Sequence, residues 1–155
     1  QSWHENIGKR QVKAPKIYLR DSGLLHALLG LSGAGALETH PKVGASWEGC
    51  AIEETLKLVQ PEAAYFWATH TGAELDLLLL ERGRRYGVEM KFQDAPRLTP
   101  SMRIALSDLR LQHLTVLYPG NLRYELDRRV TVMPLAELAT DPRGITRGGR
   151  HGRRA

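Results

Sequence analysis

The chain has 155 residues, of which 42% are hydrophobic and 25% are charged, as expected for a soluble globular protein. Its single cysteine, Cys50, excludes an internal disulfide framework and a cysteine-rich zinc site, so we expect a reducing, cytoplasmic compartment. No apolar run approaches the roughly 20 residues that a membrane-spanning helix needs. We therefore expect no membrane partner.

The net charge of +5 comes mostly from the end of the chain. The stretch RGITRGGRHGRRA contains five arginines and no acidic residue, and it lacks apolar periodicity. We therefore predict a domain at 1–140, followed by a basic disordered tail at 141–155. Such a tail would attract phosphates without sequence preference, or it would only improve solubility. Without these five arginines, 17 basic residues balance 17 acidic ones, so the rest of the chain is close to neutral.

The first half of the chain predicts a short strand and two helices. Residues 16–21 alternate as in a strand, and an apolar helix follows from Ser22 through Leu31. Residues 33–44 are rich in glycine and small side chains and are expected to form a loop. A second helix is expected to begin at residue 45 or 46 and to end at Val59, before Pro61.

The second half predicts mostly strands. A β-prone aromatic stretch precedes a hairpin, and a helix, a strand ended by Pro-Gly, one or two further strands and a last helical turn follow. This order predicts an α/β fold, with a mixed central sheet flanked by helices. The ranges are 63–69, 72–92 with its turn around Gly83, 101–111, 114–120, 123–135 and 134–140.

Three charged residues lie inside the two apolar strands of the hairpin. Asp76 belongs to the first strand, and Glu89 and Lys91 share one face of the second. Antiparallel pairing across the turn should bring Asp76 close to Glu89. Two adjacent carboxylates repel unless a proton or a cation lies between them, and Mg²⁺ prefers such oxygen ligands.

The second predicted helix contributes a fourth candidate. Glu48 begins a stripe whose other members, Ile52, Thr55 and Val59, are suited to a core, whereas Glu53 and Glu54 are expected to be solvated. A carboxylate on such a stripe needs a partner, because burying it alone is costly. The hairpin lysine or a metal could be that partner. The competing interpretation is a salt-bridged hairpin with Glu48 at a frayed helix start, and spacing alone does not choose between the two.

Several stretches of the sequence resemble a known family. KAPKIYLRDSGLLHALLGL, HPKVGASWEGCAIEE, GAELDLLLL and GVEMKF are similar to the C-terminal domain of unknown function, DUF4143 type, of prokaryotic AAA-type ATPases. The order of helix Glu, strand Asp and strand Glu-x-Lys also resembles the PD-(D/E)XK nuclease superfamily. The chain has no phosphate-binding loop and does not begin with methionine, so we expect a fragment whose ATP-binding module lies elsewhere in a longer chain.

The resemblance implies a role for each candidate residue. Asp76, Glu89 and the backbone carbonyl of Met90 would hold Mg²⁺ or Mn²⁺, and Glu48 would bind the ion through water. Lys91 would position the attacking water and stabilise charge on the phosphoryl oxygens. The residue before Asp76 is Leu75, not the proline of the literal motif.

The expected activity is hydrolysis of a DNA or RNA phosphodiester, with nucleic acid and the ATPase module as partners and a homodimer as a further possibility. A basic patch at the hairpin turn, Arg82, Arg84 and Arg85, is a candidate nucleic-acid contact, although these arginines could equally be a solvated turn. The alternatives are a catalytically silent nuclease-fold module that binds nucleic acid or a protein, and an antitoxin-like or scaffold role.

Overall fold

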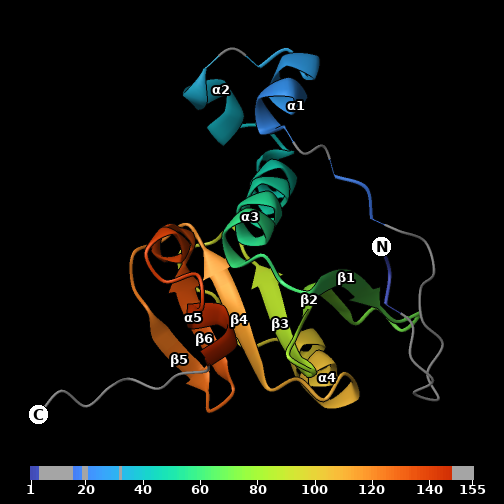
Figure 1. Cartoon of the computed structure of the whole chain (residues 1–155). Helices are drawn as coiled ribbons and strands as arrows, with labels where there is room; N and C mark the ends of the chain where they lie inside the picture. Colours follow the sequence, from blue (N-terminus) through green and yellow to red (C-terminus); the bar gives the residue numbers. More distant parts are fainter. Residues whose placement is uncertain (4–15, 19–20, 32, 148–155) are drawn as a thin grey trace, which may run out of the picture.

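The computed structural model of the protein describes residues 1–3, 16–18, 21–31 and 33–147 (Figure 1). Within this part of the chain, six strands form one mixed sheet in the order β1-β2-β3-β4-β6-β5. The strands β1 and β2, β2 and β3, and β5 and β6 pair antiparallel, whereas β4 runs parallel to both β3 and β6. The strands are β1 (Ala63–Ala68), β2 (Glu74–Glu81), β3 (Arg84–Met90), β4 (His113–Tyr118), β5 (Tyr124–Asp127) and β6 (Val130–Pro134).

Helices cover both faces of this sheet, which confirms the predicted α/β class. Helix α4 packs on one face through Met102, Ala105 and Leu106, and α3 packs on the other through Ala51 and Ile52. Figure 1 shows α1 and α2 at the end of α3 that lies away from the sheet. The helices are α1 (Ser22–Leu28), α2 (Ala34–Glu38), α3 (Val43–Val59), α4 (Pro100–Asp108), the 3-10 helix η1 (Leu135–Ala139) and α5 (Gly144–Arg147).

Local sequence explains the best-defined helix boundaries. Thr99 caps α4 by accepting a hydrogen bond from the Met102 N–H, and Pro100 occupies the first turn, where a missing N–H costs nothing. Helix α3 ends at Val59, because the next residue, Gln60, adopts a left-handed φ of 47° directly before Pro61. Among the described residues, no helix is long and apolar enough to cross a membrane.

The structure corrects the predicted elements at both ends of the chain. Residues 16–18 form no strand, residues 19 and 20 lie outside the described part, and α1 ends at Leu28 instead of Leu31. The expected loop at 33–44 contains α2, because its small residues also suit a short helix.

The first residues of the predicted tail are folded, up to residue 147. Helix α5 folds against the sheet, and Ile145 is fully buried in the same core cluster as Ile52. One apolar residue in a basic, glycine-rich stretch gave no periodic signal, which is why the stretch resembled a tail. Residues 148–155 lie outside the described part.

Candidate active site

The hairpin of β2 and β3 brings Asp76 and Glu89 together, as predicted. Leu77 pairs with Val88, and continuing this register places Asp76 opposite Glu89. Asp76 Oδ2 also accepts a hydrogen bond of 2.9 Å from the Met90 N–H. Both carboxylates are buried, with exposed fractions of 5% for Asp76 and 2% for Glu89.

A β-bulge lies at Asp76. Tyr65 of β1 pairs with Leu78, but Trp67, two residues later, pairs with Leu75, so β2 carries one extra residue in this interval. The alternation of β2 breaks there, since Leu75 joins the core cluster under α4 and Leu77 the cluster under α3. Bulges re-aim side chains near functional sites, and this one lies at a predicted ligand.

Glu89 is the most deeply buried acidic side chain of the site. Its Oε1 lies 2.7 Å from Lys91 Nζ, but its buried Oε2 has no hydrogen-bond partner among the described residues. Burial and then the neighbouring Asp76 charge raise the pKa of Glu89 to about 7, against the opposing effect of Lys91. Asp76 and Glu89 therefore favour a proton or a cation between their carboxylates.

Asp76 is subject to the same opposing effects. Burial raises its pKa, the hydrogen bond from the Met90 N–H lowers it, and the charge of Glu48 raises it further against Lys16 and Lys91. Burial lowers the pKa of Lys91, but the attraction of Glu89 and Asp76 outweighs burial, so its pKa is raised. Lys91 is therefore a protonated, half-buried ammonium at this site.

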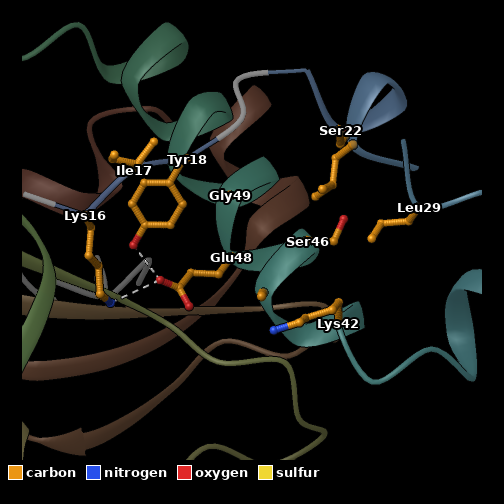
Figure 2. Close-up of a pocket in the computed structure, with 11 residues that line it drawn as sticks. Lys16, Ile17, Tyr18, Ser22, Leu29, Lys42, Ser46, Glu48 and Gly49 are labelled. Carbon is orange, nitrogen blue, oxygen red and sulfur yellow. Dashed lines mark hydrogen bonds and ion pairs between the residues drawn. The ribbon is translucent and has the colours of Figure 1, made fainter. Parts of the chain in front are cut away.

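Glu48 of α3 is connected to the hairpin carboxylate Asp76 by Lys16, which lies in the segment before α1. Its Oε1 accepts a hydrogen bond of 2.6 Å from the Tyr18 hydroxyl and lies 3.4 Å from Lys16 Nζ. Lys16 Nζ also lies 3.4 Å from Asp76 Oδ1. Figure 2 shows Lys16 and Tyr18 directed toward the Glu48 carboxylate. The Lys16 ammonium thus bridges Glu48 and Asp76, the two carboxylates that we predicted from the sequence to bind the same metal ion.

Sequence reasoning missed Lys16 and Tyr18. The signal was present, because the two lie two residues apart in KIYLRD and would share one face of an extended segment. Nothing in the sequence showed that this segment runs past Glu48. The expected solvation of Glu53 was also wrong, because its exposed fraction is 8%.

The structure does not bring the hairpin arginines to the carboxylates. Arg82 and Arg84 are exposed at the turn, which lies at the opposite end of β2 and β3, roughly 20 Å of strand from Asp76. Arg82 lies 3.6 Å from Glu81, and Arg85 donates to the Leu109 carbonyl and lies over the Trp3 ring. A nucleic acid held at this turn would therefore contact the protein away from Asp76.

A cavity of about 490 Å³ opens beside Glu48 (Figure 2). The segment 16–18, Leu25 and Leu29 from the region of α1, and Ser46 and Gly49 of α3 contribute to its walls. Lys42 lies at its rim in Figure 2, and its walls are mostly apolar. The Glu48 carboxylate therefore lies beside a cavity whose walls are mostly apolar.

The residues that could hold a small divalent ion are the carboxylates of Asp76 and Glu89. No three His, Cys, Asp or Glu side chains converge as ready metal ligands within the described ranges, and Lys16 lies between Glu48 and Asp76. Mg²⁺, however, is commonly held by one or two carboxylates, with waters completing its shell. Asp76 and Glu89 provide such a pair, and the unpartnered Glu89 Oε2 is an oxygen that a cation would satisfy.

Two family models match parts of the chain. Residues 43–138 match the model of a family described as "Domain of unknown function (DUF4143)", and residues 1–35 match a second, "Domain of unknown function (DUF8612)". Uncharacterized proteins of Mycobacterium bovis and Mycobacterium tuberculosis are each 48% identical over 138 residues, which cover 89% of this chain and 31% of each relative. No solved structure matches the chain. The chain spans less than a third of these relatives and belongs, through its larger matched part, to the DUF4143 family.

Proposed function

We propose that this domain is a metal-dependent nuclease with a PD-(D/E)XK-like site, which hydrolyses phosphodiester bonds of DNA or RNA. The observation that carries the proposal is the buried pair of Asp76 and Glu89, in which one Glu89 oxygen has no hydrogen-bond partner among the described residues. Buried carboxylates with raised pKa values cluster at functional sites. A helix that carries Glu48 and a following antiparallel hairpin also match the element order of the superfamily.

The residues that would hold Mg²⁺ or Mn²⁺ are Asp76, Glu89 and the Met90 carbonyl, with Glu48 acting through water. When bound, the ion would polarise the phosphoryl group and lower the pKa of a coordinated water. Asp76 is fixed for this role by the Met90 N–H, which leaves its Oδ1 in contact with Lys16. Glu89 is fixed in turn by Lys91.

Lys91 would act on the substrate side of the site. Its side chain has an exposed fraction of 31%, and its ammonium lies 2.7 Å from Glu89 Oε1. A fixed ammonium in a partly desolvated position stabilises negative charge that develops on phosphoryl oxygens and orients an attacking water. Its raised pKa keeps the charge in place at neutral pH.

In the longer protein we propose that an AAA-type ATPase module, which would bind ATP, accompanies this domain. The relatives support this proposal only by their length, since the match covers 31% of each. Nucleic acid would enter from the face where Glu48 and the cavity lie, because the hairpin arginines lie at the other end of the strands.

A silent nuclease-fold module is the second candidate, and one observation favours it. The Lys16 ammonium already neutralises Glu48 and Asp76, as a structural ion pair would. Such a module would bind nucleic acid or a protein partner without cutting. Cleavage assays therefore have to include a direct test of metal dependence.

The proposal predicts that Lys91→Met cuts about 10²–10³-fold more slowly than the wild type. The wild-type domain and the variant are incubated with supercoiled plasmid, a four-way junction and single-stranded RNA, with Mg²⁺ or with EDTA. Lys57→Met is the matched control, because Lys57 is exposed and its ion pair of 2.9 Å with Glu54 is exposed as well. We expect Mg²⁺-dependent cleavage by the wild type and the control. Equal cleavage by all three proteins would remove Lys91 from the mechanism.

A further inference from the structure

The Lys16 ammonium occupies a built cation site. Its Nζ lies 3.4 Å from Glu48 Oε1, 3.4 Å from Asp76 Oδ1 and 3.8 Å from Glu74 Oε2. The same ammonium lies 4.8 Å from the centre of the Phe66 ring, which adds a cation–π contact. Three carboxylates and one aromatic face thus surround a single positive charge.

The Lys16 ammonium contacts the Asp76 oxygen that a metal ion would need as a ligand. Asp76 Oδ2 is engaged by the Met90 N–H, so Oδ1 is its freer oxygen, and Oδ1 is the atom that Lys16 contacts. A divalent ion on Oδ1 and an ammonium 3.4 Å from the same atom would repel each other strongly. The two cations therefore compete for Asp76 Oδ1.

The segment that carries Lys16 makes its polar side-chain contacts with the acids of the site. Lys16 contacts Glu48 and Asp76, and the Tyr18 hydroxyl donates to Glu48, whereas Ile17 between them is 89% exposed. Within the described part of the chain, the polar side-chain contacts of segment 16–18 therefore end on proposed metal ligands or on Glu74 beside them. The segment lies in the match to the second family, whereas the acids lie in the DUF4143 match.

We propose that Lys16 is a tethered cation that holds the metal-free site together and must withdraw when a divalent ion binds. The inference rests on the proposed metal site and deepens it. Segment 16–18 then links metal binding at the carboxylates to the part of the chain that precedes the DUF4143 match. Lys16 is a positioning residue here, and it lowers the affinity for the metal instead of contributing to it.

The test measures Mn²⁺ affinity by calorimetry on the wild type, Lys16→Met, Lys16→Arg and the control Lys57→Met, all at pH 8. Removing the competing charge should tighten Mn²⁺ binding about tenfold in Lys16→Met, which corresponds to about 1.4 kcal/mol. Lys16→Arg keeps a cation and should bind no more tightly than the wild type. Lys57→Met should match the wild type, since its ion pair with Glu54 is exposed.

A second measurement follows the segment itself. Amide hydrogen exchange of residues 16–18 in the wild type should become faster when Mn²⁺ is added, because the carboxylates release Lys16. Wild-type metal binding with equal or weaker affinity in Lys16→Met, or with unchanged exchange at 16–18, would overturn this inference and leave the metal site intact. An absence of binding in both the wild type and Lys16→Met would overturn the metal site as well.

Discussion

Replacing Asp76 with asparagine is expected to abolish Mn²⁺ binding and to lower metal-dependent cleavage by at least about 10³-fold. The substitution removes the charge that would bind the ion and preserves the shape of the side chain. The amide oxygen of the introduced asparagine can still accept the hydrogen bond that the Met90 N–H donates to Asp76, so the hairpin should fold. The measurements are calorimetric titration with Mn²⁺ and plasmid nicking.

The same substitution should leave the metal-free protein at least as stable as the wild type. The Asp76 charge raises the pKa of Glu89, so removing it relieves a repulsion inside the core. Glu54→Gln is the matched control, because it makes the same chemical change at a carboxylate that pairs with Lys57, and its side chain is 43% exposed. We expect the control to bind and cut like the wild type. Intact metal binding in the Asp76 variant would contradict the assignment of Asp76 as a ligand.

The stability of the metal-free protein is expected to fall as pH rises from about 4.5 to about 7. The ordinary pKa of Glu89 is 4.5 and its pKa in the folded protein is about 7, mainly because of burial and then because of Asp76. Between these values the folded chain keeps a proton that the unfolded chain has lost, so the stabilisation is complete below pH 4.5 and is lost as pH passes 7. A shift of this size corresponds to about 3 kcal/mol in the free energy of unfolding.

Glu89→Gln isolates this effect from other titrating groups, such as His113, whose pKa is lowered mainly by burial. Urea unfolding of both proteins in EDTA at pH 5 and pH 8 gives the comparison. The gain in stability from wild type to variant should be about 3 kcal/mol larger at pH 8 than at pH 5. A gain that does not change with pH would show that Glu89 titrates normally in the folded protein.

The sequence predicted the sheet and its main helices because their signals are local. The apolar runs around Asp76 and Glu89 and the helical stripe through Ile52 depend only on neighbouring residues, and each became the expected element. Helix α5 was missed because the burial of Ile145 depends on the distant sheet. The bulge at Asp76 was missed because a register shift is set by strand pairing and leaves no composition signal.

The candidate site was predictable in part for the same reason. Asp76 and Glu89 are brought together by a short hairpin, so their proximity followed from the turn. The position of Glu48 beside the hairpin depends on contacts between segments that are distant in sequence. Lys16 likewise contacts Asp76 across 60 positions of sequence. Only the folded chain shows that contact, and it shows that Asp76 and Glu48 already hold the Lys16 ammonium.

The most direct test of the proposed metal site is calorimetric titration of the metal-free wild-type domain with Mn²⁺ at pH 8 and at pH 6. We expect a single ion to bind per chain at pH 8, and we expect weaker binding accompanied by proton release at pH 6, because Glu89 has a pKa of about 7 and must lose its proton to bind metal. The absence of saturable Mn²⁺ binding at pH 8 would contradict the proposal and leave Glu48, Asp76 and Lys16 as a structural ion cluster.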